Sequence, residues 1–233
     1  MMDKHGSRVG LIVLAVLGVA FVAIGIFAGV AQVARTLREA RLIENLPELD
    51  APALHSLASD TLVAVTGILE PNGDRADAEG LIIYLEQAWA IEESEDEGWE
   101  GAWETVYRAM PTTTLTLTGG SVTLRYTGEI AIDGTLHESR LYIPEQGRKV
   151  DDIIEGTLRH IGFKAGDHLT VVGTTTAAGI MPNRVFGGDR QALLWHFEQR
   201  VVGLRITGVI FDLVGLILMV VAGVLLWRQR KAS

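Results

Sequence analysis

The sequence predicts a membrane protein of the α+β class, in which two transmembrane helices flank one mainly antiparallel β-barrel or β-sandwich domain. Residues 9–34 and 206–227 are apolar runs, and each is long enough to cross a bilayer because a spanning helix needs about 20 apolar residues. Between these runs, short apolar or alternating stretches are separated by glycine and other turn residues. This pattern is typical of antiparallel sheets rather than of βαβ units.

Charge is distributed unevenly along the 233 residues. The net charge is −9, but residues 35–205 contain 15 basic and 27 acidic side chains, and both ends of the chain are basic. An acidic domain between two anchors does not suit binding to nucleic acid or to an anionic lipid surface. The chain also contains no cysteine, which excludes a cysteine-ligated zinc domain, a disulfide scaffold and a cysteine nucleophile.

The first apolar run is expected to be an uncleaved anchor, because it exceeds the roughly 7–15-residue apolar core of a signal peptide. Two crossings place both ends of the chain on one side of the membrane and the middle on the other. The tails, residues 1–8 and 228–233, are short and basic, and cytoplasmic segments are enriched in Lys and Arg. We therefore expect two cytoplasmic tails and an extracytoplasmic β-domain.

The elements between the two spans follow from local patterns. Residues 35–60 are expected to form a helical connector, in which the first helix continues until Pro47, because proline ends a helix. Residues 61–188 are predicted as the β-rich domain, and residues 189–205 as a juxtamembrane helix with Asp189 as its N-cap. Turns such as Gly119-Gly120 and Asp133-Gly134 separate the predicted strands, which are 61–69, 80–93, 100–109, 113–118, 121–126, 129–132, 135–143, 158–163 and 168–176.

Asp212 is the one acid inside a predicted span. Burying a charged side chain in a bilayer costs free energy, so such a residue is a functional candidate. We expect it to have a polar or charged partner that offsets this cost. We expect Asp212 to lie at shallow depth or to pair with Arg205, two turns earlier. Gln32 and Arg35, at the same end of the first span, are the other candidate partners. Proton or ion handling and oligomer packing are the alternatives.

Small residues recur in both spans. Gly25 and Gly29 form a small-xxx-small pattern in the first span, and Gly208 and Gly215 give the second span similar positions of low bulk. Such residues allow two helix backbones to approach closely. We expect them to pack the two spans against each other, with dimerisation as the alternative.

An acidic run marks the predicted hairpin loop near residues 93–100. The run includes Glu95, Asp96 and Glu97, but it lacks the ligand spacing and internal glycine of a calcium loop. We interpret it as a solvated hairpin tip that, together with Trp99, is a candidate partner surface.

No pattern in the sequence predicts a catalytic or cofactor site. The six histidines are scattered, and the chain has no Gly-x-Ser-x-Gly elbow, phosphate-binding loop or dinucleotide-binding glycine motif. We therefore expect a non-enzyme with neither cofactor nor metal. A dispersed hydrolytic site assembled from a histidine, an acid and a serine is the alternative.

Several short motifs occur in an order that resembles a known family. They are Val65–Gly67, the apolar-aromatic strand 81–89, Trp103–Val106, the hairpin 111–126 and Gly166–Gly173. This order between two anchors resembles the "beside a membrane" domain of the GIDE/MULAN membrane E3 ubiquitin ligases. Those ligases also carry a RING built on cysteine and histidine zinc ligands, and since this chain has no cysteine, no ligase residue is carried over. The chain looks like the RING-less prokaryotic relatives, which implies a sensing or binding role in a bacterial or archaeal cell membrane.

These observations predict a membrane-anchored, non-catalytic binding, scaffold or sensing protein that serves as an accessory subunit of a membrane complex. Its expected partners are the lipid bilayer and a membrane protein or a second copy of the chain, and nucleic acid is not among them. Two alternatives stay open. One is an oligomeric transport or pore-related subunit that uses Asp212, and the other is an NfeD-like partner of a membrane protease or stomatin-type scaffold, which predicts a five-stranded barrel.

Overall fold

The computed structural model describes residues 4–71, 77, 79–94, 98–128 and 130–231. The chain divides into two compact units, one made of Met1–Glu44 and Leu194–Ser233 and the other of Asn45–Leu193. The first unit is helical, and the second contains all the described strands.

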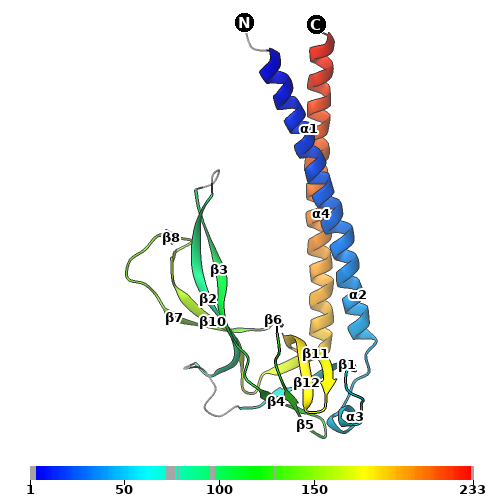
Figure 1. The fold of residues 1–233 in the computed structure, drawn as a ribbon, viewed down its shortest axis with the longest axis vertical. Coiled ribbons are helices and arrows are strands. Elements are labelled where there is room, and N and C mark those ends of the chain that lie inside the picture. The colour runs from blue at the N-terminus through cyan, green and yellow to red at the C-terminus, as the bar shows by residue number, and fades with distance from the viewer. Residues whose placement is uncertain (1–3, 72–76, 78, 95–97, 129, 232–233) are drawn as a thin grey trace. The chain divides into compact units, whose positions relative to one another are not determined.

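Two long helices run side by side in the helical unit (Figure 1). Helix α1 (Lys4–Ile26) continues through a π-helical segment, η1 (Phe27–Gln32), into α2 (Val33–Glu44), and the partner helix is α4 (Arg190–Lys231). The segments Gly10–Glu44 and Arg190–Gln229 are long and apolar enough to cross a membrane. The start of α1 and the end of α4 lie at the same end of the pair, which is the arrangement that two crossings require.

Five strands of the second unit close into a ring. In ring order they are β1 (Leu62–Leu69), β4 (Thr113–Leu117), β5 (Gly120–Leu124), β12 (Gly179–Gly187) and β11 (His168–Thr176), which pairs back with β1. The β5–β12 pair is parallel and the other four pairs are antiparallel. This connectivity is a Greek-key barrel of the OB type. Fully buried side chains from every ring strand fill it, among them Leu69, Leu115, Leu124, Leu169 and Ile180.

Strand β12 is the ring strand that sequence patterns miss. Proline is rare inside central strands because it cannot donate to the ladder, so Pro182 argues against a strand over these residues. In the structure, Pro182 pairs with Gly173 at a register shift between β11 and β12, where a bulge tolerates proline. On the outside of the ring, β6 (Ala131–Gly134) adds to β12 in parallel. The short helix α3 (Ala51–His55) precedes β1, and the Asp50 side chain caps it.

The other strands form an open antiparallel sheet, in the order β3 (Gly98–Ala109), β2 (Leu81–Ser94), β10 (Leu158–Lys164) and β7 (His137–Tyr142). A small hairpin of β8 (Lys149–Val150) and β9 (Ile153–Ile154) lies before β10 in the chain. Strands β2 and β3 are inserted between β1 and β4, and β6 to β10 are inserted between β5 and β11. Two insertions into the barrel connections therefore build the open sheet.

The predicted α+β class, with a β-domain between two apolar helices, is confirmed. The sequence left a barrel and a sandwich as alternatives. The structure has a closed barrel into which an open four-stranded sheet is inserted.

Candidate functional site

The two long helices approach each other closely at glycines. A Cβ atom built on Gly25 would lie 2.7 Å from the carbonyl oxygen of Gly208, and one built on Gly215 would lie 2.7 Å from the Val22 side chain. Gly29 is less crowded, since a Cβ there would lie 3.6 Å from the Cα of Gly208. A larger residue at Gly25 or Gly215 would push the backbones apart.

Asp212 lies at this same contact. Its carboxylate occupies the space that a Cβ on Gly25 would need, and its Oδ1 atom is buried. Within the described residues, Oδ1 has no hydrogen-bond partner, and no ion pair joins Asp212 to Arg205 or Arg35. Arg205 is exposed and lies about 10 Å away along the same helix. The structure brings Asp212 to the glycine contact but not to the side chains considered as its partners, Arg205, Gln32 and Arg35.

The π-helical segment η1 begins two residues after Gly25. Short π segments inside α-helices occur frequently at functional sites. The backbone carbonyl of Gln32, the last residue of η1, accepts a hydrogen bond from Oγ1 of Thr36 at 2.9 Å. The middle of the helix pair therefore combines an acid with one buried carboxylate oxygen, close backbone contact and an irregular helix.

The predicted partner surface at the hairpin tip is described only in part. Glu95, Asp96 and Glu97 lie outside the described residues. Trp99 is 41% exposed, and the guanidinium carbon of Arg148 lies 3.8 Å from its ring centroid. This cation–π contact leaves part of the indole open to solvent.

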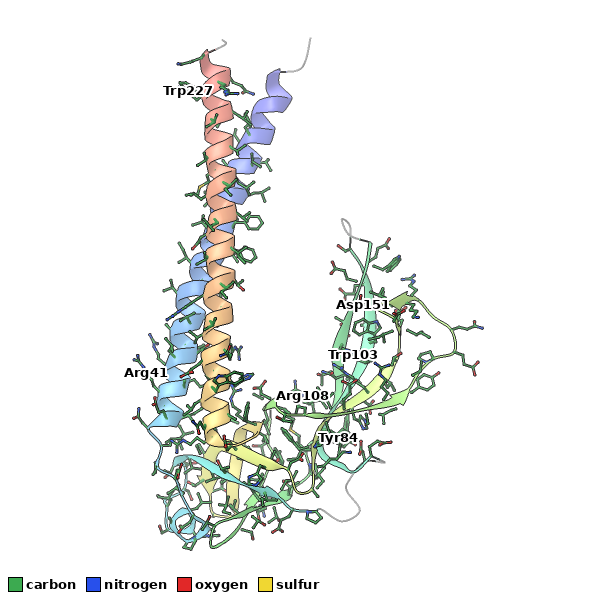
Figure 2. All side chains as sticks on the ribbon, turned by 180° about the vertical axis from the view of Figure 1, so that it is seen from behind. Arg41, Tyr84, Trp103, Arg108, Asp151 and Trp227 are labelled. Carbon is green, nitrogen blue, oxygen red and sulfur yellow. The ribbon has the colours of Figure 1, made fainter. Side chains whose placement is uncertain are left out.

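Two further tryptophans, Trp89 on β2 and Trp103 on β3, pack on the same sheet, and Figure 2 labels Trp103. Trp89 and Trp103 lie directly opposite each other on β2 and β3, with ring centroids 5.1 Å apart in an edge-to-face arrangement. The guanidinium carbon of Arg159 lies 4.0 Å from the Trp103 ring centroid. A Cβ on Gly101 would overlap the Trp89 ring, so the glycine provides the space for this indole.

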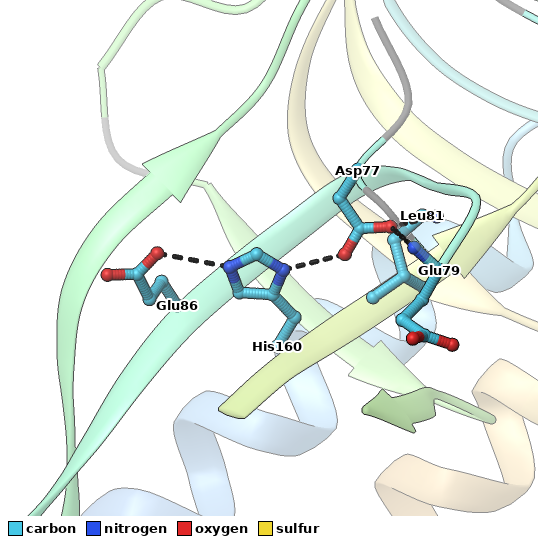
Figure 3. A network of polar contacts seen from close by, with 5 residues as sticks. All are labelled: Asp77, Glu79, Leu81, Glu86 and His160. Atoms are coloured by element: carbon cyan, nitrogen blue, oxygen red, sulfur yellow. Dashed lines mark hydrogen bonds and ion pairs between the residues drawn. The ribbon is translucent and has the colours of Figure 1, made fainter. Parts of the chain in front are cut away.

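A buried ionic network joins β2, β10 and the residue Asp77 (Figure 3). Nδ1 of His160 lies 2.6 Å from Oδ2 of Asp77, and Nε2 lies 3.0 Å from Oε2 of Glu86. The other oxygen of Asp77 accepts hydrogen bonds from the backbone N–H groups of Glu79 and Leu81. Both ring nitrogens of His160 therefore lie within hydrogen-bond distance of a carboxylate oxygen, which holds the ring between β2 and Asp77.

A tyrosine-lined groove of about 530 Å³ lies beside this network, where β2 and β3 approach the barrel. Tyr84 lies at its edge, with its ring centroid 4.2 Å from that of His160. Burial, and then the nearby Asp77 carboxylate, raise the pKa of Tyr84. Burial likewise raises the pKa of Tyr126. Figure 2 labels two of its lining residues, Tyr84 and Arg108. The full lining is Tyr84, Tyr107, Arg108, Ala109, Met110, Pro111, Tyr126 and Gly128.

No sequence pattern predicts the His160 network or the groove. Asp77 and Glu86 precede His160 by 83 and 74 residues, so no local spacing connects the three side chains. In the described part of the chain, no group of three or more histidine, cysteine, aspartate or glutamate residues could hold a metal ion.

Comparisons with protein-family models, with curated proteins and with solved structures find no match to the chain. The resemblance to the GIDE/MULAN family stays a prediction from short motifs.

Proposed function

We propose that this chain is a membrane-anchored, non-catalytic binding protein whose β-domain recruits or senses a protein partner outside the cytoplasm. The proposal rests on the uneven distribution of exposed large apolar side chains over the β-domain. Eight such residues are described between residues 45 and 193, and six of them lie on the open sheet or directly after its strand β7. These six are Trp99, Val106, Tyr107, Leu141, Tyr142 and Ile143.

Exposed apolar side chains concentrated on one part of a domain are typical of a protein contact surface. The buried cluster inside the barrel comes mainly from the ring strands, and the open sheet adds Ile82, Ile83 and Phe163 to it. The six exposed side chains take no part in this core. The sheet also carries the aromatic side chains Trp99 and Tyr107, which are enriched in protein interfaces. The open sheet therefore supplies the binding surface, and the two apolar helices supply the anchor.

The test is purification of the tagged full chain in mild detergent after cross-linking, with partners identified by mass spectrometry. Tyr107→Ser combined with Tyr142→Ser is expected to abolish the specific cross-link. The control is Met181→Ser, which changes an exposed apolar side chain on the barrel and should keep the cross-link. A monomeric, partner-free wild-type particle would count decisively against the proposal.

The proposed topology has its own test. A reporter that is active only outside the cytoplasm should work when it is inserted in the loop at residues 93–99 and fail when it is fused at residue 233. Activity at residue 233 would overturn the orientation.

The second candidate function is an NfeD-like role beside a membrane protease or stomatin-type scaffold. The specific observation in its favour is the closed ring of five strands, because that role predicts a five-stranded barrel. A membrane protease or a stomatin-type scaffold protein among the cross-linked partners would support this role, and a partner of any other class would exclude it.

A further inference from the structure

Strand β3 has one open side along its twelve residues. It pairs with β2, and among the described strands it has no neighbour on its other side. The edge of a sheet offers unpaired backbone N–H and C=O groups, which can bind an added strand.

The hydrogen bonds of β2 identify the β3 residues whose polar groups face outward. The N–H of Trp89 donates to the carbonyl of Thr157, and its carbonyl accepts from the N–H of Gly156, so both point away from β3. Trp103 lies directly opposite Trp89, and opposite residues in an antiparallel pair either exchange both bonds or neither. The polar groups of Trp103 therefore face the open side, and so do those of Thr105, two residues further on.

The two faces of β3 differ in chemistry. Glu100 and Glu104 are exposed on one face, and Glu100 lies opposite the exposed Glu92 of β2. Trp99 and Trp103 lie on the other face, since successive side chains alternate between the faces of a sheet. A neighbouring strand would place its alternate residues beside the acids and beside the tryptophans, within about 5 Å.

The nearby cations already have partners. The guanidinium of Arg148 lies over Trp99, and that of Arg159 lies over Trp103 and pairs with Glu138 at 3.0 Å. From Gly98 to Thr105, β3 carries two acids, Glu100 and Glu104, and no cation, so this part of its edge is negative, while Arg108 lies near the other end of the strand. A second copy of this edge would be repelled by like charge, whereas a basic strand would be attracted.

We propose that the open edge of β3 binds an extended segment of a partner protein in which basic and apolar residues alternate. The basic residues lie beside Glu100 and Glu104, the apolar residues lie beside Trp99 and Trp103, and the backbone bonds to Trp103 and Thr105. This inference rests on the proposed binding function and specifies the chemistry of the partner.

The probe is a fluorescent eight-residue peptide of alternating lysine and valine, added to the full chain in nanodiscs of zwitterionic lipid. A glutamate–valine peptide of the same length is expected to bind at least tenfold more weakly. Hydrogen exchange at the amides of Trp103 and Thr105 should slow when the lysine–valine peptide binds, while that of Glu104, which faces β2, is slow throughout. Failure of the wild-type chain to bind the lysine–valine peptide would overturn the proposal.

Thr105→Pro removes an outward N–H and is expected to weaken peptide binding at least tenfold. The matched control Thr105→Val keeps the N–H and loses only the hydroxyl, so binding should be unchanged. Unaltered binding by a Thr105→Pro protein that retains slow exchange at Glu104 would overturn the proposal. If that variant fails to fold, the double change Glu100→Lys and Glu104→Lys decides the question, because it should reverse the preference toward the glutamate–valine peptide.

The two proposals fail in different ways. A cross-linked partner that survives Thr105→Pro and the charge reversal would overturn the β3 edge and leave the binding function standing. Absence of both a cross-linked partner and peptide binding would overturn both.

Discussion

Replacing His160 with phenylalanine is expected to destabilise the β-domain by about 3–4 kcal/mol. The His160 ring makes two hydrogen bonds, to the carboxylates of Asp77 and Glu86, and hydrogen bonds to charged groups contribute about 1.5–3 kcal/mol each. The Glu86 side chain is 30% exposed, so water replaces part of its bond, whereas the Asp77 side chain is 4% exposed. Loss of one partner from a buried ion pair costs about 3–5 kcal/mol. The lower part of this range applies because Asp77 keeps two backbone N–H donors.

The assay is thermal unfolding of the full chain in detergent micelles, followed by the β-sheet signal in circular dichroism. In a domain of this size, 1 kcal/mol shifts the midpoint by about 2–4 °C, so His160→Phe should lower it by about 10 °C. His137→Phe is the matched control. It removes a histidine whose Nε2 lies 3.0 Å from Asp167, in a pair whose side chains are 43% and 23% exposed. Exposed pairs contribute little, so the control should shift the midpoint by less than about 2 °C. An equally small shift for His160→Phe would refute the conclusion that the contacts of His160 with Asp77 and Glu86 hold the sheet together.

Three further predictions concern the helix pair and the groove. Gly25→Leu should destabilise the helix pair by about 1–3 kcal/mol through overpacking. Gly10→Leu is the control and should have no such effect, because there is open space around Gly10. Thermal unfolding followed by the helical signal in circular dichroism measures both variants. Asp212→Asn should leave the same transition unchanged, because no described group bonds its buried Oδ1, and a clear loss of stability would reveal a partner for the charge. Tyr126 should make the fold sensitive to alkali. Its pKa is raised in the folded state, so stability is complete below pH about 10 and falls by up to about 1.4 kcal/mol per pH unit above it, as the unfolded phenol ionises first. Tyr126→Phe should flatten this fall in urea titrations at pH 9–12, and an unchanged slope would show that Tyr126 is not its source.

Local patterns predict many elements of this fold, but they miss β12, and the turn expected at Asp133-Gly134 is wrong because both residues belong to β6, which pairs with β12 while β7 pairs with β10. The hairpin at Gly119-Gly120 and the helix that Asp189 caps are determined by residues close together in the chain, and both occur in the structure. The approach of Gly25 to Gly208 also follows from residue size, because small residues in long apolar helices favour backbone contact.

The parts that sequence reasoning could not predict depend on distant residues. Closure of the ring requires Ile180 to meet Leu124 in parallel, and neither strand carries a signal for the other. The pairing of His160 with Asp77 is equally non-local. The surroundings of Asp212 differ from the prediction for another reason. The free-energy cost of a charge in an apolar helix suggests a charged partner, whereas in the structure the Asp212 carboxylate packs against Gly25.

The insertion of one sheet into the connections of the barrel also governs the order of folding. Thr66 on β1 hydrogen-bonds to Thr170 on β11, which is 104 residues later in the chain. At about 5–20 residues per second, a ribosome needs roughly 5–20 s to supply that partner. The β2–β3 hairpin needs no distant partner, and hairpins form within about 1–10 μs. During synthesis the inserted hairpin is therefore ready long before the barrel can close, and the edge of β1 that pairs with β11 stays open until the end of the domain is made.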